Sequence, residues 1–368
     1  MRVVIVGSSM AGSAMALALS KFCEVSVYDE KKENEIHEKV CGNVCTYSLE
    51  NFVKELGIKE DFVTSRYHRI NIFSKRNWAS FPTKEYEISR KKLISEMMNS
   101  ARKNGVKFNF STRFQNIQKI RGHYEIFFEK HGKTFSDKAD VVIGADGAAS
   151  GVAKSIGKEN KDFFLFLQTR VRKGHISRKD LIPEKNSYNV FVGKSFGYYS
   201  YIFPSKDGKE YKVGLGGDLD SNVNGQFKGF LDLLGIRKYK LTGAVVPKPK
   251  INDGSGNVFL IGDSSCNVKY SAGGIVPILE QVIALRDKIL YNKNRGLINL
   301  RRKILFNRRM TRIIEKMNDA DFDEVLGILR DSRYRNAFSS RDSLRKSDIL
   351  SLSSPRLLLL AARISLRN

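Results

Sequence analysis

Short apolar runs separated by small polar residues dominate the first thirty positions of the chain. The run Val3-Val4-Ile5-Val6 has no polar interruption, which is typical of a parallel strand buried on both faces. Residues 11–21 are rich in Ala, Ser, Gly and Leu and predict a helix with a tightly packing face, and residues 24–29 predict the next strand. Because the connections are short, these elements predict a β-α-β unit at the amino terminus.

The pattern along the rest of the chain changes from strand-like to helical and back. Alternating apolar and polar positions over residues 66–89 predict strands, and residues 90–104 predict a helix. Three or four further strands are expected between residues 106 and 144, and residues 163–218 are again rich in strand-forming and aromatic side chains. From residue 275 to the end the pattern is helical.

The turn after the first strand has the composition of a phosphate-binding loop. It reads GSSMAG from Gly7 to Gly12, so the first and third glycines of the G-x-G-x-x-G pattern are present and Ser9 replaces the second. Such a turn lets backbone N–H groups and the positive end of a helix approach a pyrophosphate. Gly7, Ser9, Ala11 and Gly12 are therefore candidate dinucleotide-binding residues, in the context of a strand before the turn and a helix after it.

Three acidic residues follow predicted strands at positions suited to the sugar parts of a dinucleotide. Asp29 ends the second strand, where a carboxylate accepts hydrogen bonds from ribose hydroxyls and repels a 2′-phosphate, so FAD or NAD is preferred over NADP. An ordinary solvated acid is the alternative for Asp29. Asp146 and Asp263 each follow a buried strand and precede small residues that open a helix. Asp263 would accept hydrogen bonds from the ribityl hydroxyls of a flavin.

A second helix start is expected beside the flavin ring. Gly262 precedes Asp263, and Gly273 and Gly274 lead into an apolar helical segment that begins with Ile275. A positive helix end at that point would stabilise an anionic reduced flavin. Gly262, Gly274 and Ile275 are therefore further candidate cofactor-binding residues.

The chain is strongly basic, which narrows the classes of partner. It has 64 Lys and Arg against 39 Asp and Glu, a formal net charge of +25. Two interpretations of this charge are open: an ordinary lysine-rich surface, or a surface that attracts an anionic membrane lipid or an anionic substrate. No nucleic acid is expected as a partner, because the sequence has no zinc-finger spacing, helix-turn-helix signal or RNP-type strand.

Cysteine content and apolar run lengths indicate the compartment. Four cysteines in 368 residues form no disulfide framework, no signal peptide precedes the first strand, and no apolar run reaches the roughly 18 residues that span a bilayer. We expect a cytoplasmic protein without a metal site, and peripheral contact with the inner face of the cell membrane is open. The leucine-rich residues 357–363 either lie in a membrane interface or pack onto the core, and packing is favoured.

The positions of these motifs resemble those of the para-hydroxybenzoate hydroxylase-like FAD superfamily. The resemblance rests on the turn ending at Gly12, on Asp146 within Ala-Asp-Gly, and on Asp263 within Gly-Asp, and it covers about residues 1–285. It implies that Arg90, at the start of a predicted helix, reaches the FAD. It also implies that the backbone at Phe114 touches the adenine side.

The resemblance and the pattern together predict an α/β (α+β) fold. It comprises a Rossmann-like FAD-binding domain, a second antiparallel-sheet substrate domain and a helical C-terminal region. The predicted boundaries are 1–65, 90–160 and 251–285 for the discontinuous FAD-binding domain, 66–89 and 161–250 for the substrate domain, and 286–368 for the basic helical C-terminal region.

Within that superfamily, two segments are similar to geranylgeranyl reductases of archaeal lipid synthesis. The first, from Lys39 to Val44, is similar to that family's Lys-Pro-Cys-Gly loop, with Val40 where the family has proline. The resemblance implies that Cys41, Gly42 and Val44 lie beside the flavin. Cys41 is the candidate catalytic residue, as a group that touches flavin or substrate without being assigned the proton.

The second segment, from Tyr199 to Pro204, is similar to the family's Tyr-x-Trp-x-Phe-Pro, with Tyr201 at the tryptophan position. It implies that Tyr199, Tyr201, Phe203 and Pro204 bind substrate and form an apolar wall for a polyprenyl chain. Simple packing of aromatic side chains in a strand core is an equal alternative. The glycine loop before the last helical region also resembles the family's flavin loop, with Tyr270 in place of the usual proline.

The resemblance implies an FAD-dependent reductase that saturates C=C bonds of geranylgeranyl or other polyprenyl chains, in membrane-lipid precursors or in the free diphosphate. Reduced FAD would supply the hydride. The electron donor is open between ferredoxin and NAD(P)H, because no second nucleotide-binding turn is evident. Two rivals use the same cofactor residues: an FAD-dependent monooxygenase of an apolar substrate, and a non-catalytic flavoprotein that binds lipid or quinone and relays electrons.

Overall fold

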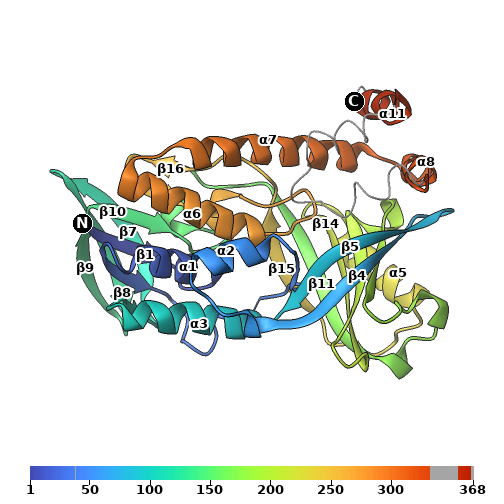
Figure 1. The fold of residues 1–368 in the computed structure, drawn as a ribbon, viewed down its shortest axis with the longest axis horizontal. Coiled ribbons are helices and arrows are strands. Elements are labelled where there is room, and N and C mark those ends of the chain that lie inside the picture. Colours follow the sequence, from blue (N-terminus) through green and yellow to red (C-terminus); the bar gives the residue numbers. More distant parts are fainter. Residues whose placement is uncertain (38, 332–354, 366–368) are drawn as a thin grey trace.

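The computed structural model describes residues 1–37, 39–331 and 355–365 of the chain. Within these residues the strands form a six-stranded, an eight-stranded and a three-stranded sheet. The six-stranded sheet and its helices occupy one end of the elongated molecule, and the eight-stranded sheet occupies the other (Figure 1). The predicted fold class, with a nucleotide-binding sheet, a second sheet and a helical C-terminal region, is confirmed.

The six-stranded sheet contains the amino-terminal β-α-β unit. Its neighbouring strands are parallel except for the β16–β17 pair at one edge. In spatial order the strands are β16 (Gly254–Ser255), β17 (Val258–Leu260), β10 (Val141–Gly144), β1 (Arg2–Val6), β2 (Glu24–Tyr28) and β6 (Lys107–Asn109). Since β1, β2, β10 and β17 are parallel, their carboxyl ends meet at one rim of the sheet, which is where ligands bind in such folds.

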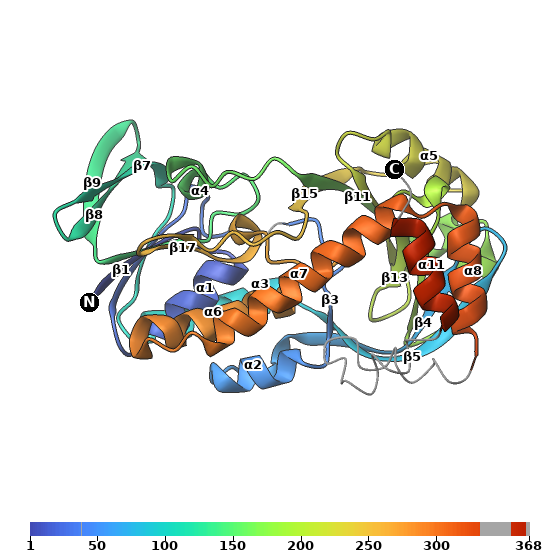
Figure 2. The same cartoon turned by 90° about the horizontal axis from the view of Figure 1, so that it is seen from above.

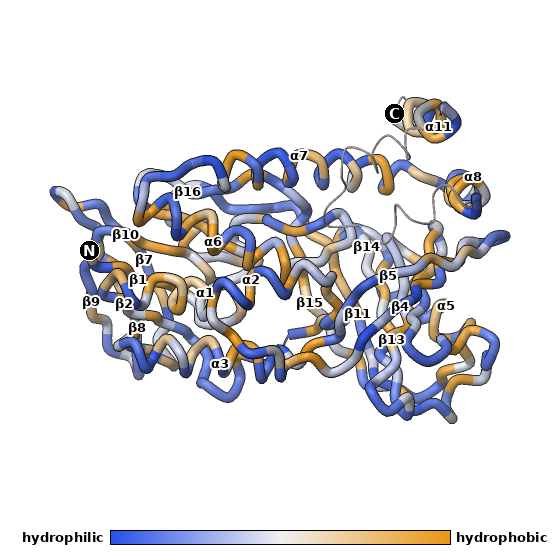
Figure 3. Tube along the Cα trace, in the orientation of Figure 1, coloured by the Kyte–Doolittle hydropathy of each residue, from blue (hydrophilic) through white to orange (hydrophobic). Residues whose placement is uncertain are grey.

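Both faces of this sheet are covered, which explains the uninterrupted apolar run of β1. Val3 and Ile5 pack with helices on one face, and Val4 and Val6 pack with the three-stranded antiparallel sheet on the other. The apolar strands and helix faces meet in the interior of this end of the molecule (Figure 3). The covering helices are α1 (Met10–Leu19), α3 (Arg90–Lys103) and α6 (Ile275–Tyr291), with α2 (Leu49–Glu55) against α6. The small sheet consists of β7 (Arg113–Ile120), β8 (His123–Lys130) and β9 (Lys133–Ala139), with α4 (Gly151–Ser155) beside it.

The eight-stranded sheet is antiparallel, as predicted, except where β12 pairs parallel with β4. These two strands come from distant parts of the chain, so no hairpin imposes an antiparallel direction on them. In spatial order the strands are β15 (Thr242–Pro247), β11 (Phe163–Arg172), β14 (Glu210–Asp218), β13 (Tyr199–Pro204), β12 (Ser187–Phe191), β4 (Val63–Phe73), β5 (Trp78–Ile88) and β3 (Val44–Thr46). Helix α5 (Val223–Leu233) packs on β14 and β11.

The C-terminal part is helical, as its pattern predicted. Helix α6 is followed by α7 (Arg295–Lys316), α8 (Asp319–Leu329) and α11 (Pro355–Ser365). Seen from above, α7 crosses the molecule obliquely and ends beside α8 and α11 (Figure 2). Short 3₁₀ helices are η1 (Glu60–Phe62), η2 (Lys173–His175), η3 (Lys179–Leu181), η4 (Lys194–Phe196) and η5 (Gly262–Ser265). No helix in the described part of the chain combines the length and apolar character needed to cross a bilayer.

The segment between residues 106 and 144 contains five strands, where the sequence pattern predicted three or four. The extra strand arises because β6 and β10 join the parallel sheet while β7, β8 and β9 form a sheet of their own. Strand β9 carries mostly exposed side chains, so its pattern lacks the apolar alternation of a half-buried strand. The predicted domain boundaries stay a prediction; β3, inside the first predicted segment, pairs with the eight-stranded sheet.

The leucine-rich tail forms α11 and packs onto the neighbouring helices. Leu360 and Ile364 are buried against Met317 and Phe322, whereas Leu359 is 71% exposed. This arrangement agrees with the favoured prediction that the leucines contact the core, for part of the helix. The predicted helical region also includes residues 332–354, which lie outside the described residues.

Candidate active site

The predicted phosphate-binding turn joins β1 to α1, and its backbone requires two glycines. Gly7 has a φ of +97°, and a Cβ there would overlap the carbonyl oxygen of Ala145. A Cβ on Gly12 would overlap the carbonyl oxygen of Gly7. Ser9 has a φ of −72°, which any residue adopts, so serine at the second glycine position fits without backbone strain.

The amino end of α1 is an open position for an anion. No side chain caps its first N–H groups and its first turn contains no acidic residue, so their partial positive charge is not offset. Arg90, at the start of α3, donates from Nη2 to Ser9 Oγ at 3.4 Å. Arg90 is 8% exposed, its Nε has no hydrogen-bond partner, and no carboxylate of the described chain pairs with it. A buried guanidinium beside free helix N–H groups fits a pyrophosphate.

Asp29 lies directly after β2 and holds the turn in place. Ser8 donates to Asp29 Oδ2 from its backbone N at 2.6 Å and from Oγ at 2.7 Å, and Lys31 N donates to Oδ1 at 2.9 Å. The carboxylate thus fixes the turn between β1 and α1. Its position, at the end of β2, is the one at which a ribose contact was predicted. Ser8 was not among the predicted site residues, and its hydroxyl within the turn was the only available signal.

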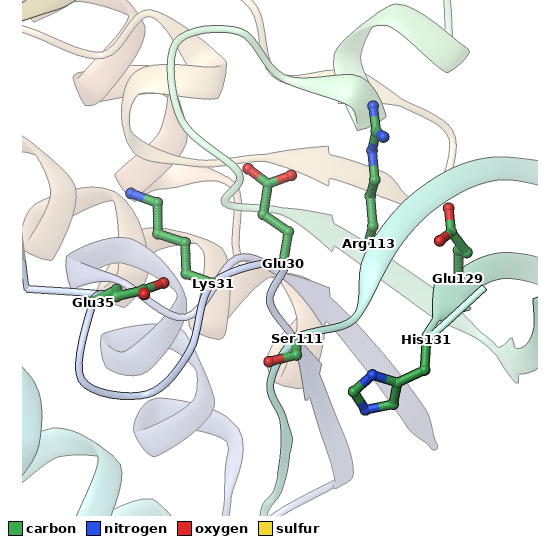
Figure 4. Close-up of a pocket in the computed structure, with 7 residues that line it drawn as sticks. All are labelled: Glu30, Lys31, Glu35, Ser111, Arg113, Glu129 and His131. Atoms are coloured by element: carbon green, nitrogen blue, oxygen red, sulfur yellow. The ribbon is translucent and has the colours of Figure 1, made fainter. Parts of the chain in front are cut away.

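A cavity of about 410 Å³ opens next to Asp29, between the loop after β2 and the small sheet (Figure 4). Its lining is charged and consists of Glu30, Lys31, Glu35, Ser111, Arg113, Glu129 and His131. Phe114, the predicted adenine contact, follows Arg113, and a Cβ on Gly151 would lie 3.2 Å from Phe114 Cδ1. The cavity therefore lies at the predicted ribose and adenine end of the site.

Asp146 interacts with the helix that follows it. Val152 N donates to its Oδ2 at 3.0 Å and Ser150 Oγ donates to its Oδ1 at 2.6 Å, so the carboxylate caps the amino end of α4. Burial raises the pKa of Asp146, and these hydrogen bonds oppose the rise. The contact between Ala145 and Gly7 keeps this segment beside the turn, and a cofactor contact of Asp146 itself stays a prediction.

Gly262, Asp263 and Gly274 meet close to α1, as the sequence predicted for one site. Gly262 has a φ of +68°, and a Cβ there would lie 3.0 Å from Ala11 Cβ. Asp263 is 9% exposed, and a Cβ on Gly274 would lie 3.7 Å from its Oδ1. Helix α6 begins at Ile275 without a side-chain cap or an acidic residue in its first turn, so its positive end is open.

Lys39 adds a cation that the predicted site did not contain. Its Nζ forms an ion pair with Asp263 Oδ2, although the two residues are 224 positions apart in the chain. The pair lies between the loop that carries Cys41 and the start of α6. The sequence named Lys39 only as part of a similar segment, because its partner is set by tertiary structure.

The loop that carries Cys41 lies against the eight-stranded sheet. A Cβ on Gly42 would lie 2.7 Å from Phe203 Cε2, so a larger residue would push the loop and this ring apart. Cys41 Sγ accepts a hydrogen bond from Asn43 N at 3.3 Å, and Val44 begins β3. The structure therefore brings the predicted flavin-facing loop into contact with a predicted substrate residue.

A buried ion pair holds this loop from the sheet side. Lys212 Nζ donates to the carbonyl oxygen of Gly42 at 3.1 Å and pairs with Glu87, and both side chains are less than 10% exposed. Lys212 was not predicted as a site residue, since a lysine in a strand pattern carries no signal of its partner.

Lys212→Met is expected to lower the free energy of unfolding by about 3–5 kcal/mol, because it leaves the Glu87 carboxylate buried and unpaired. The double variant Lys212→Met/Glu87→Leu should recover most of that loss. Equilibrium urea unfolding of both variants measures the difference, with Lys209→Met, at an exposed position of the same hairpin, as control. A double variant as unstable as the single one would show that the pair contributes through packing alone.

Three of the four predicted substrate residues, Tyr199, Tyr201 and Phe203, line one face of β13, because alternate side chains of a strand point the same way. The Tyr201 ring lies 4.6 Å from Phe203 and 6.1 Å from Tyr199 between centroids, and Tyr201 OH donates to Gln168 Oε1 at 2.9 Å. Pro204 ends the strand. Tyr201 and Phe203 belong to a buried aromatic cluster, so they also pack as strand core.

The aromatic strand is tied to the glycine loop that precedes α6. Tyr198 OH donates to the carbonyl oxygen of Tyr270 at 2.7 Å, and Tyr199 OH donates to that of Ser271 at 2.8 Å. Burial, and to a smaller extent the neighbouring Cys41, raise the pKa of Tyr199, so its hydroxyl stays protonated and donates. The aromatic side chains of β13, the Cys41 loop and the start of α6 therefore lie together.

The arrangement fits FAD. Two open helix ends and the buried Arg90, which pairs with no carboxylate of the described residues, suit the pyrophosphate and an anionic ring. The carboxylates of Asp29 and Asp263 suit sugar hydroxyls. Bulky side chains are excluded where backbone must approach the cofactor, at Gly7 and Gly12. The contacts of individual residues with FAD stay predictions.

Known proteins resemble this chain in sequence. A family profile described as an FAD binding domain matches residues 1–173. The chain is 24% identical to the digeranylgeranylglycerophospholipid reductase of Methanocaldococcus jannaschii, over 95% of this chain and 96% of that one. It is 25% identical to the chloroplastic geranylgeranyl diphosphate reductase of Arabidopsis thaliana, over 74% of this chain, and it spans 62% of that relative's length.

A solved structure has a similar fold. It is a geranylgeranyl bacteriochlorophyll reductase-like protein from Thermoplasma acidophilum, with a TM-score of 0.81 and 18% sequence identity, covering 99% of this chain and 98% of that one. The predicted FAD cofactor and the predicted resemblance are confirmed.

Proposed function

We propose, from the premise that this chain is an FAD-dependent oxidoreductase of the geranylgeranyl reductase type, that it saturates C=C bonds of polyprenyl chains in membrane-lipid precursors. The observation that carries the proposal is the continuity of the aromatic face of β13 with both loops at the predicted flavin ring. Phe203 contacts Gly42, and the hydroxyl of Tyr199 is bound to Ser271. An apolar chain on this face would lie beside the ring without needing hydrogen bonds.

When reduced FAD is bound, the chemistry it supplies is hydride transfer to one alkene carbon. The residues of this chain hold the alkene and exclude water: Tyr199, Tyr201 and Phe203 would bind the isoprenoid, and the Cys41 loop would close the side toward the sheet. The second alkene carbon needs a proton, which water or a nearby acid would deliver. Cys41 is proposed as a residue that touches flavin or substrate.

The basic surface supports an anionic substrate. The net charge of +25 would attract a phospholipid headgroup or a diphosphate, and it would favour contact with the inner face of the cell membrane. We propose ferredoxin or NAD(P)H as the electron donor. A buried aromatic strand beside the cofactor loops would also serve an apolar-substrate monooxygenase or an electron relay, so the test includes both.

We expect the photoreduced FAD-loaded protein, incubated without oxygen with a geranylgeranyl phospholipid, to reoxidise its flavin and to add two hydrogens, about 2 Da, per reduced bond. Flavin absorbance and lipid mass spectrometry give the two readouts. The control is the same lipid already saturated, which should leave the flavin reduced.

Two other outcomes of this experiment would support the rival functions instead. A gain of one oxygen atom, about 16 Da, that appears only in air would indicate the monooxygenase. Flavin that stays reduced with every prenyl lipid, but is oxidised by a quinone, would indicate the electron relay.

A further inference from the structure

Helix α7 presents an outward face on which apolar and arginine side chains alternate. Leu300, Ile304 and Thr311 are buried on its inner side. The side chains that point away from them form what we call the α7 surface, which consists of Ile298, Arg302, Leu305, Phe306, Arg309 and Arg312. At 100° per residue these positions fall within about a third of the helix circumference.

The apolar members of the α7 surface are unusual for a solvated helix. Ile298, Leu305 and Phe306 are 47%, 45% and 44% exposed, so each leaves nearly half of its side chain uncovered. They are spaced by seven and one residues and therefore lie on one side of the helix. Single exposed apolar residues are ordinary, but a row along one helix indicates a contact surface.

The charge of the same face has one sign. Arg302, Arg309 and Arg312 have no ion-pair partner among the described residues, whereas Arg301 and Lys303 at the margins pair with acids of other elements. The one acidic residue of α7, Glu315, pairs with Lys248 on the inner side. The arginines thus face outward, and no carboxylate of the part of the chain that the structure describes pairs with them.

Helix α11 lies beside the C-terminal end of α7. It packs on α7 and α8, and the three helices lie together on the side of the molecule seen in Figure 2. Its Leu359 is 71% exposed and Arg356 is exposed beside it. Leu359 and Arg356 line a pocket together with Glu324 and Ile328 of α8, so they are not part of the α7 surface.

We propose that the α7 surface docks on an anionic lipid bilayer, with the leucine, isoleucine and phenylalanine side chains in the interface and the arginines on lipid phosphates. Helices with this composition lie in the plane of a membrane, and each basic residue adds attraction to an anionic leaflet. The inference rests on the proposed membrane-lipid substrate, because it names the surface through which the chain would reach that substrate.

A bilayer fits the α7 surface better than an acidic protein does. A protein partner would pair the arginines with carboxylates, but it would not require three large apolar side chains to alternate with them over several helical turns. A bilayer interface takes up both kinds of side chain at once. The two partners therefore differ in how much the apolar residues contribute.

The FAD-loaded full chain should sediment with vesicles of phosphatidylglycerol and phosphatidylcholine, and only weakly with phosphatidylcholine alone. The variant Arg302→Gln/Arg309→Gln/Arg312→Gln should lower the partition coefficient on the order of 100-fold, since each basic residue adds about fivefold. Leu305→Ser/Phe306→Ser should lower the partition coefficient at both low and high salt, because salt screens the charges but not the burial of apolar side chains. Flavin content verifies that the variants are folded, and vesicle binding needs no turnover, so this inference and the proposed function can fail separately.

A charge-matched control separates the surface from net charge. The variant Lys228→Gln/Arg237→Gln/Lys238→Gln removes three exposed cations at α5 and the segment after it, at the opposite edge of the molecule in Figure 1. Retained binding in this control supports the α7 surface. Equal loss of vesicle binding in both triple variants would overturn the assignment to the α7 surface. Unchanged vesicle binding of Leu305→Ser/Phe306→Ser would show that these apolar side chains do not insert, and would overturn the bilayer as the partner.

Discussion

Gly12→Ala is expected to weaken FAD binding strongly. The added Cβ would overlap the carbonyl oxygen of Gly7, and that oxygen belongs to backbone that is itself held against Ala145. No side chain is available to move aside, so the turn must shift away from the amino end of α1, where the pyrophosphate would bind. We expect the purified variant to be colourless, and FAD titration to give a dissociation constant raised at least about 100-fold, the effect of about 2.7 kcal/mol.

The same substitution should also destabilise the apoprotein by about 1–3 kcal/mol, the usual cost of overpacking. Gly229→Ala is the matched control, because Gly229 lies on α5 with no atom within 4 Å of an added Cβ. That control should bind FAD normally and be as stable as the parent or slightly more stable. A yellow Gly12→Ala protein with ordinary affinity would mean that the cofactor does not use this turn.

Arg90→Met is expected to weaken FAD binding while leaving the apoprotein equally or more stable. In the structure this guanidinium is buried and no carboxylate of the described residues pairs with it, so its desolvation is largely uncompensated. A bound pyrophosphate would offset it through charge-assisted hydrogen bonds of about 1.5–3 kcal/mol. We therefore expect the dissociation constant of FAD to rise on the order of 10- to 100-fold.

Opposite signs of the two effects distinguish a ligand-binding residue from a structural one. Fluorescence titration with FAD measures the first, and urea unfolding of the apoprotein measures the second. Lys91→Met is the control, because Lys91 is the exposed neighbour on the same first turn of α3. A loss of apoprotein stability with unchanged FAD affinity would assign Arg90 to the fold instead.

Local patterns were enough to predict the turn and the strand ends. Gly7 and Gly12 need a special backbone or close approach, and a buried apolar strand before them identifies the context. Asp29 and Asp263 were chosen as candidates in the same way, because each follows a strand of the parallel sheet, and these strands end at one rim. In these cases the physical requirement acts over a few neighbouring residues.

Contacts between distant segments could not be predicted from the sequence. Lys39 pairs with Asp263 across 224 positions and Lys212 pairs with Glu87 across 125, and a lone lysine does not indicate its partner. The parallel pairing of β12 with β4 also depends on how distant segments assemble, since either direction satisfies the same apolar alternation. The α7 surface was visible in sequence only as an arginine-rich helix, because exposure of its leucine and phenylalanine depends on what covers them.

The bonds from Tyr198 and Tyr199 to the carbonyls of Tyr270 and Ser271 have a mechanical consequence. They connect the strand that would hold the isoprenoid, β13, to the loop from which α6 starts. A lateral shift of β13 would therefore move the positive amino end of α6, which would face the flavin ring. Binding of a prenyl chain against β13 and the electrostatic environment of the flavin ring would thus be coupled through two hydroxyl groups.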